Sequence, residues 1–129
     1  MSEIPNELRY TKEHEWIRLV GDAVVVGITD YAQNALTDVV WVEMDPDLEG
    51  TDVAEMESFC SVESTKSVSE IYSPVSGTIL EFNMSLEDAP EQLNQSPYQD
   101  GWIAKIKPHN LDDIDNLLDA EAYSNVVGE

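Results

Sequence analysis

Apolar and polar residues alternate in short runs along most of this chain, and small turn-forming residues separate the runs. Two β-rich runs, at 16–20 and 23–28, flank a Gly-Asp pair, which predicts a β-hairpin. Thr29 then provides a suitable N-cap for a short helix over 30–36, with the acidic Asp30 at its positive end. The first third of the chain therefore predicts strands with one short inserted helix.

A second hairpin is predicted near the middle of the chain. Within residues 57–72, two alternating runs flank the polar tetrad Ser64-Thr65-Lys66-Ser67, and a Ser-Pro-Val-Ser-Gly turn follows. This pattern places Lys66 at the tip of the hairpin. Further strands are expected at 38–44, 53–56, 78–83 and 101–107.

In the last part of the chain, the apolar residues no longer alternate with polar ones. Residues 84–100 carry two prolines together with amides and acids, which predicts a long surface loop. From Leu111 onward, apolar residues at 111, 114, 117 and 118 follow helical spacing. We expect an amphipathic helix there and a second short helix over 120–127.

Length and composition fit one packed domain. A chain of 129 residues with 42% hydrophobic residues can bury a core without disulfides or metal. Together with the many short strands, this predicts a mainly β barrel or sandwich in a single domain over residues 1–129. Its strand core is expected over about 10–107 and its helical tail over about 111–127.

The charge is strongly negative, with 27 acidic residues against 6 basic ones and a net charge of −21. Nucleic acids and anionic membranes are bound by patches of Lys and Arg, so neither is expected as a partner. Such a charge favours a monomer, and partners that carry basic residues around their active sites.

Three further features predict a cytoplasmic protein of bacterial type. The single Cys60 excludes an internal disulfide. No apolar run approaches the roughly 20 residues that span a bilayer. The first seven residues have the character of neither a signal peptide nor a transit peptide.

The sequence offers little for catalysis. A nucleophile needs a base within hydrogen-bond reach, and the only histidines are His14 and His109. Cys60 lies among apolar strand residues and is expected to be an inert core thiol. Two distant histidines and one cysteine do not make a zinc site, and the glycines form no phosphate-binding loop. We therefore expect no catalytic residue, no metal site and no enzyme activity.

Lys66 is the unusual residue of the chain. It is the only basic residue between Arg18 and Lys105, a span that holds seventeen Asp and Glu. A Schiff-base lysine needs a lowered pKa, whereas the neighbours Glu63 and Glu70 would stabilise the charged amine. An exposed ion pair would contribute only about 0–1 kcal/mol. From the residues alone, an ordinary solvated charge and a modified amine both stay open.

The residues around Lys66 resemble the lipoyl-lysine segment of the glycine cleavage system H protein family. The resemblance extends over roughly residues 8–123, and its motifs occur in order and at matching spacing. These motifs are Val62-Glu63-Ser64-Thr65-Lys66-Ser67, Ile71–Gly77, His14-Glu15-Trp16, Gly27–Gln33, Val39–Glu43, Ser96-Pro97-Tyr98 and Asp100–Ile103. Biotinyl domains typically show Met-Lys-Met, and the lipoyl domains of 2-oxoacid dehydrogenases show Asp-Lys-Ala, whereas this chain has Thr-Lys-Ser.

This resemblance implies a barrel-sandwich hybrid fold and a carrier without catalytic activity of its own. (R)-Lipoate is then expected on Lys66, attached through an amide. The arm would take the aminomethyl group of glycine from a pyridoxal-phosphate-dependent glycine decarboxylase (P protein) to a tetrahydrofolate-dependent aminomethyltransferase (T protein). Dihydrolipoamide dehydrogenase (L protein) would reoxidise the dithiol, and lipoate-attaching enzymes complete the expected partners.

The family also implies a surface cleft that shelters the loaded arm from water. A cationic amine in that cleft needs acceptors, and the resemblance assigns this role to Glu15 of His-Glu-Trp and to Glu70. Glu70 stands where Asp is more usual. The chain departs from the family pattern at Glu13, Ala35 and Thr37, where Ser, His and Gly are found in other members.

Two other functions stay open at this point. A lipoyl-bearing protein could hand its lipoyl group to other acceptors or serve a redox pathway. An unmodified acidic β domain could only bind partners. Intact mass separates the last of these from the other two, and glycine–CO₂ exchange separates an aminomethyl carrier from a lipoyl relay.

Overall fold

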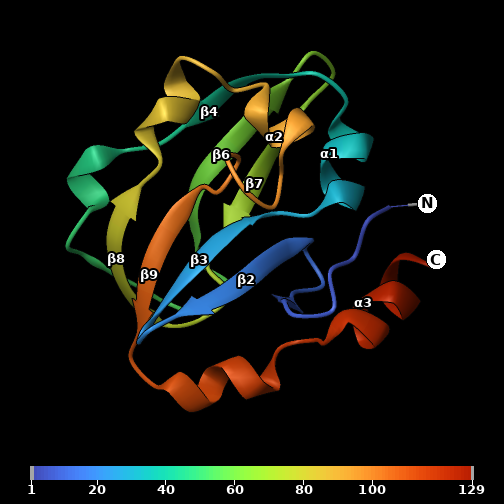
Figure 1. The fold of residues 1–129 in the computed structure, drawn as a ribbon. Coiled ribbons are helices and arrows are strands. Elements are labelled where there is room, and N and C mark those ends of the chain that lie inside the picture. Colours follow the sequence, from blue (N-terminus) through green and yellow to red (C-terminus); the bar gives the residue numbers. More distant parts are fainter. Residues whose placement is uncertain (1, 129) are drawn as a thin grey trace.

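Nine strands form two antiparallel sheets in the computed structural model, which describes residues 2–128. In spatial order, the six-stranded sheet contains β1 (Arg9–Tyr10), β2 (Glu15–Val20), β3 (Ala23–Ile28), β9 (Ala104–Pro108), β8 (Gly77–Phe82) and β5 (Asp52–Val53). The three-stranded sheet contains β4 (Val39–Glu43), β6 (Ser58–Ser64) and β7 (Val68–Tyr72). The two sheets lie one behind the other in Figure 1. The predicted mainly β fold is confirmed.

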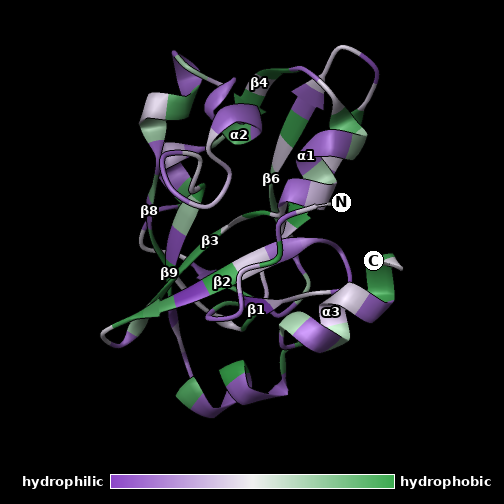
Figure 2. Ribbon diagram, turned by 45° about the vertical axis from the view of Figure 1, so that its right-hand side comes forward, coloured by the Kyte–Doolittle hydropathy of each residue, from purple (hydrophilic) through white to green (hydrophobic). Residues whose placement is uncertain are grey.

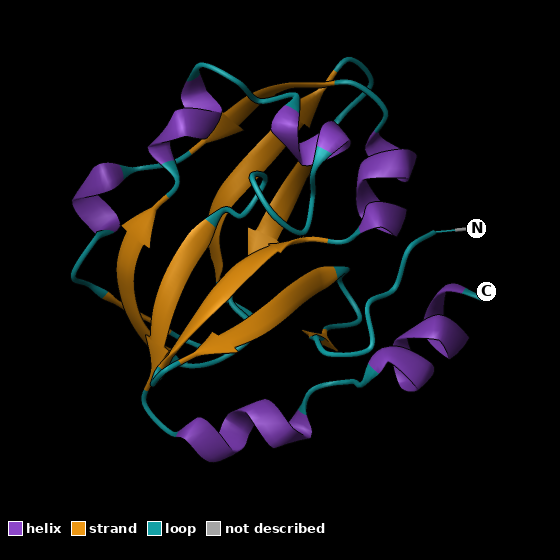
Figure 3. Cartoon of the chain, viewed as in Figure 1, coloured by secondary structure: helices purple, strands orange, loops and turns teal. Residues whose placement is uncertain are grey.

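Short helical segments connect these strands and lie at the periphery of the sheets (Figure 3). They are α1 (Asp30–Leu36), α2 (Gln92–Gln95) and α3 (Ala120–Val127), and the 3₁₀ turns η1 (Pro46–Leu48), η2 (Met84–Glu87) and η3 (Leu111–Asn116). The inserted helix α1 begins as predicted, because the Thr29 side chain accepts a hydrogen bond from the amide of Ala32. The helical tail is also present, as η3 and α3.

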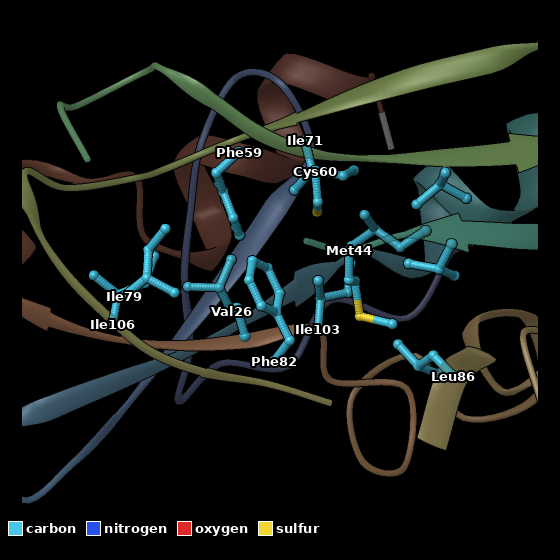
Figure 4. Packing of buried hydrophobic residues seen from close by; sticks show 14 of the residues in the cluster. Val26, Met44, Phe59, Cys60, Ile71, Ile79, Phe82, Leu86, Ile103 and Ile106 are labelled. Carbon is cyan, nitrogen blue, oxygen red and sulfur yellow. The ribbon is translucent and has the colours of Figure 1, made fainter. Parts of the chain in front are cut away.

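The main core fills the space between the two sheets. In Figure 4, Phe59, Cys60 and Ile71 of the three-stranded sheet point toward Val26 and Phe82 of the six-stranded sheet. All five side chains are buried. Interdigitated apolar side chains of this kind are the largest stabilising contribution to a two-layer fold. Cys60 is buried in this core, as predicted.

A second, smaller core lies on the opposite face of the six-stranded sheet. Tyr10 and Trp16 are fully buried there against Tyr123 of α3, and Tyr98 joins them. The strand β3 is buried on both faces, with Val24 and Val26 in the main core and Val25 in the second one. This accounts for its almost continuous hydrophobic colour in Figure 2. The helical tail therefore covers a face of the sheet.

The prediction of a long surface loop over residues 84–100 was wrong. This segment forms η2 and α2, and its two leucines, Leu86 and Leu93, are fully buried in the main core. Asn94 joins α2 to the start of β4, because its Oδ1 accepts the amide of Val39 (2.9 Å) and its Nδ2 donates to the carbonyl of Thr37 (2.6 Å). Long-range packing thus orders a stretch whose local composition favours a loop.

Other element boundaries also differ from the predictions. The amphipathic helix expected from Leu111 is the 3₁₀ segment η3, in which Ile114 is buried and Leu111 is exposed. The strand expected at 53–56 ends at Val53, because the chain turns at Met56, whose φ is 63°. The final strand begins at Ala104 and not at 101.

Candidate functional site

The hairpin of β6 and β7 presents Lys66 at its tip, as the sequence predicts. The last strand pair is Glu63 with Val68, and residues 64–67 close the turn. The Ser64 hydroxyl oxygen accepts the backbone amides of Lys66 and Ser67, each at 3.2 Å, and the Ser64 amide donates to the carbonyl of Ser67 (2.8 Å). These bonds hold the backbone of Lys66 in one conformation, so the tip is a defined starting point for a long side chain.

The amine of Lys66 has neither an ion-pair nor a hydrogen-bond partner among the described residues. Of the six basic residues, only Lys12 shares this condition. The other four are engaged as follows: Arg9 with the carbonyl of Leu117 (3.2 Å), Arg18 with the carbonyl of Tyr98 (2.7 Å), Lys105 with Glu81 (3.1 Å) and Lys107 with Asp22 (3.5 Å). The Lys66 side chain is also exposed, so a modifying enzyme can reach it.

A groove of about 160 Å³ lies beside this hairpin. Its lining residues come from the turn before β2, from the end of β3, from α1 and from β7: Glu13, His14, Ile28, Tyr31, Ala32, Ala35, Leu36, Ser69 and Ile71. Most of the lining is apolar, which suits a hydrocarbon arm. Ser69 is three residues past Lys66, roughly 10 Å along the strand. The groove is therefore near the tip of the hairpin.

Two of the three departures from the family pattern line this groove. Glu13 and Ala35 both belong to its wall, so a carboxylate and a methyl group line the groove at these two positions. Thr37 is outside the lining; it ends α1 with a φ of 64°, a conformation that glycine adopts more easily.

Glu15 lies beneath the surface and not in the lining of the groove. Its side chain is fully buried between the sheets, where one carboxylate oxygen accepts from the Thr11 hydroxyl (2.5 Å) and the other from the Tyr72 amide (3.3 Å). Burial raises the pKa of Glu15 to about 7, against the opposing effect of these two hydrogen bonds. This carboxyl group titrates close to neutral pH.

Glu70 is an exposed residue of β7, and no hydrogen bond of the described residues joins it to Glu15. The two acids nevertheless have a common neighbour. Burial is the main cause that raises the pKa of the Cys60 thiol, and the charges of Glu15 and Glu70 raise it further. Glu15 is inside the molecule, whereas strand alternation places Glu70 on the outer face of β7, opposite to the face of Ser69 and Ile71 that lines the groove.

His14 is a groove residue that the sequence analysis did not assign to the site. Its φ is 73°, and its Nδ1 lies 2.8 Å from the hydroxyl of Tyr123 on α3. Its ring is 4.9 Å from that of Tyr31, on the opposite wall. Burial lowers the pKa of His14. The His-Glu-Trp motif signals its importance, whereas nothing in the sequence signals its contact with Tyr123.

The remaining chemistry-bearing residues are dispersed. His109 lies 3.5 Å from Asp52 at the surface, far along the chain from the groove residues. Within residues 2–128, no group of three or more His, Cys, Asp and Glu side chains is arranged to hold a metal ion. Over the same residues, no helix has the length and apolar character needed to cross a membrane.

Comparisons with known proteins agree on one family. The family model described as glycine cleavage H-protein matches residues 8–129. The glycine cleavage system H protein of Geobacillus thermodenitrificans is 54% identical over 125 residues, 97% of both chains. That of Staphylococcus carnosus is 51% identical over 126 residues, 98% of both chains. The crystal structure of a glycine cleavage system H protein from Mycobacterium marinum superposes with a TM-score of 0.86 at 38% identity, covering 98% of this chain and 100% of that one.

Proposed function

Because the chain belongs to the glycine cleavage H-protein family, we propose that Lys66 is the residue that carries its lipoyl group, through an amide. The protein is a lipoyl carrier of the glycine cleavage system and not an enzyme. As a carrier it takes the aminomethyl group of glycine from the decarboxylase to the aminomethyltransferase. When bound, lipoate supplies the dithiolane sulfur to which this cargo is attached.

The observation that carries the assignment to Lys66 is its free, exposed amine on a fixed hairpin tip. Four of the six basic residues are engaged with other groups. Lys12 is also unpaired and lies on the turn between β1 and β2, but only Lys66 stands in the Val62–Ser67 segment that resembles the lipoyl-lysine motif of the family. Amide formation removes the positive charge, so the modified side chain is neutral and can lie along an apolar surface. The groove beside Ser69 and Ile71 offers such a surface close to the tip.

Intact mass spectrometry tests this assignment. After co-expression with lipoate-attaching enzymes, the protein should gain the mass of one lipoyl amide. Lys66→Ala should abolish the gain, and Lys12→Ala, which removes the other unpaired lysine, should keep it. A wild-type protein that gains no mass under these conditions would refute the proposal. Glycine–CO₂ exchange with the cognate decarboxylase then distinguishes an aminomethyl carrier from a lipoyl relay.

The proposed partners follow from membership of the glycine cleavage system. They are the glycine decarboxylase (P protein), the aminomethyltransferase (T protein), dihydrolipoamide dehydrogenase (L protein) and the enzymes that attach lipoate. All of them meet a strongly negative surface, since the net charge is −21. Basic residues around their active sites would accelerate the encounter. A cytoplasmic location completes the proposal; the single, buried Cys60 is compatible with a reducing compartment.

We further propose that the groove between α1 and β7 receives the loaded arm, with Glu15 near its amine. Glu70 alternates with Ser69 and Ile71 and lies on the outer face of the edge strand β7, so it would approach the amine around that edge. The apolar wall excludes water, and exclusion of water slows hydrolysis of the cargo. Glu15 is fully buried, so its negative charge would act on the amine of the arm across a short distance and without a direct contact at the surface. A cation in the groove favours the charged form of Glu15 and would lower its pKa from about 7.

A pair of double variants tests the role of these acids. Glu15→Gln with Glu70→Gln should shorten the lifetime of the loaded protein in the absence of the aminomethyltransferase. Glu87→Gln with Glu121→Gln removes two exposed acids that lie outside the groove and serves as a control of equal charge. Equal release rates in both double variants would contradict the assignment of Glu15 and Glu70.

A further inference from the structure

The outer face of the three-stranded sheet presents apolar side chains close to Lys66. The strand register places Trp41, Glu63 and Val68 in one row, directly opposite each other on neighbouring strands. Side chains of opposed residues point to the same side of a sheet. Their inward-facing neighbours Val42 and Val62 are fully buried, so this row faces outward. The turn that carries Lys66 begins immediately beyond it.

This outer face exposes three large apolar side chains to solvent. Val68 is 64% exposed and Trp41 is 39% exposed, and Val40, at the irregular position of β4, is 48% exposed. The Trp41 indole is also held in place, since its Nε1 donates to the Glu43 carboxylate at 2.8 Å. Exposed apolar side chains gathered on one face mark an interaction site, and a preorganised tryptophan is a common anchor of protein interfaces.

Carboxylates surround these apolar side chains. Glu63 lies between Trp41 and Val68, and the next row across the sheet contains Glu43 and Glu70. The partner that fits this surface therefore presents an apolar recess bordered by Lys and Arg side chains.

We propose that this outer face is the docking surface for the enzyme that attaches the lipoyl group to Lys66. That enzyme forms a bond at Nζ itself, so its active site must reach the hairpin tip, and its rim must contact the neighbouring rows of the sheet. An enzyme that acts on the distal end of the arm works a full arm length away and does not need this surface. The inference rests on the proposed lipoylation of Lys66.

The reaction at the tip sets the chemistry of this partner. The Nζ–acyl bond forms while the bond between the acyl carbon and its activating group breaks. The activating group leaves with the bonding electron pair, and the lysine ammonium releases two protons. The partner therefore holds an activated lipoyl ester or anhydride, and the carboxylates next to Lys66 meet its cationic rim.

The experiment compares two pairs of exposed apolar residues. Trp41→Thr with Val68→Thr removes the apolar side chains of the outer face and keeps strand-forming residues. Leu19→Thr with Val20→Thr removes an equally exposed pair from the β2–β3 hairpin. The initial rate of lipoyl transfer is measured with purified unmodified protein, lipoate, ATP and a lipoate ligase. We expect kcat/KM to fall at least about tenfold for the first pair and to stay within about twofold for the second.

A second measurement separates this proposal from general damage to the site. Both double variants are lipoylated to completion by long incubation, verified by mass, and assayed for glycine–CO₂ exchange with the decarboxylase. The proposal predicts exchange within about twofold of wild type in both. Unchanged lipoyl transfer in the Trp41/Val68 variant, or an equal loss in transfer and exchange, would overturn it. A wild-type protein that accepts no lipoyl group would instead refute the proposed function, and this surface with it.

Discussion

At the scale of single residues, Glu15 is the most unusual group of the site. Its carboxyl group is fully buried, and within residues 2–128 only the Thr11 hydroxyl and the Tyr72 amide donate to it. Two neutral donors do not replace the hydration that an ionised carboxylate loses, so its pKa rises to about 7 from an ordinary value of 4.5. The protein thus keeps a carboxyl group at the junction of its two sheets that is half ionised near neutral pH.

This raised pKa predicts that Glu15 weakens the folded state as the pH rises. The folded state binds the proton more tightly than the unfolded state, so the stabilising contribution is complete below pH 4.5 and is lost as the pH rises through 7. Relative to Glu15→Gln, the wild-type free energy of unfolding should fall by about 3 kcal/mol between pH 4 and pH 8. Urea denaturation of both proteins across this range measures the difference.

A control for this prediction is Glu87→Gln, which removes an exposed acid of η2 that is not among the groups that shift the pKa of Glu15. Its stability should follow the wild-type pH profile. Any hydrogen-bond cost of the glutamine at position 15 is independent of pH and shifts the whole curve without changing its slope. Parallel curves for wild type and Glu15→Gln would show that Glu15 does not titrate between pH 4.5 and 7.

Sequence reasoning predicted the structural position of Lys66 better than that of Glu15, for a physical reason. The hairpin turn is a local feature, and the chemistry of an exposed lysine is independent of distant residues. The burial of Glu15 depends on β7, whose Tyr72 lies 57 positions along the chain. Strand alternation does place Glu15 on the same side as Ile17, a core residue. In a chain with 27 acids, the local pattern alone does not distinguish a buried carboxyl group from a solvated one.

At the scale of elements, the C-terminal helix α3 supports the groove from behind. The hydroxyl of Tyr123 lies 2.6 Å from Oγ1 of Thr29, the N-cap of α1, and 2.8 Å from Nδ1 of His14. Its ring stacks on Tyr10, with ring centres 4.6 Å apart. One residue of the tail therefore contacts both the helix and the turn that form two walls of the groove.

Tyr123→Phe should loosen these two walls while preserving the stacked ring. Thr29 is fully buried, and the loss of a hydrogen bond to a buried group should lower the free energy of unfolding by about 1–2 kcal/mol. The NMR signals of the His14 ring should shift as well, since Nδ1 loses its neighbour. Tyr10→Phe is the matched control, because its hydroxyl donates to the carbonyl of Pro5 in the same stack and does not contact His14. His14 signals that change equally in both variants would contradict this role of Tyr123.

The predicted elements that proved right are those set by local pattern. The hairpins β2–β3 and β6–β7 and the N-cap at Thr29 each depend on residues within a few positions of one another. The segment over 84–100 depends on distant contacts, since Asn94 bonds Val39 and Leu93 packs into a core built by both sheets. An isolated leucine in a polar stretch does not show where its partners lie.

At the scale of the whole molecule, the fold must tolerate a large excess of negative charge. The net charge is −21, and the described residues contain only two lysine–carboxylate ion pairs and one histidine–carboxylate contact, each on side chains that are about half exposed or more. Exposed pairs of this kind contribute little to stability. The layered apolar cores must therefore outweigh the repulsion between carboxylates. The same negative surface charge helps partners with basic surfaces to approach.

Because repulsion outweighs the few ion pairs, salt should stabilise this protein. At pH 7.5, raising NaCl from 20 mM to 500 mM shortens the screening length. This weakens both the repulsion between carboxylates and the attraction within the ion pairs, but the repulsion is much larger. We expect the melting temperature, measured by calorimetry, to rise by about 4 °C or more, which corresponds to roughly 1 kcal/mol for a domain of this size. The same comparison near pH 4.1, the isoelectric point, should show little change, since the net charge is close to zero there. A melting temperature that falls with salt at pH 7.5 would mean that the ion pairs of Lys105 and Lys107 outweigh the repulsion between the carboxylates.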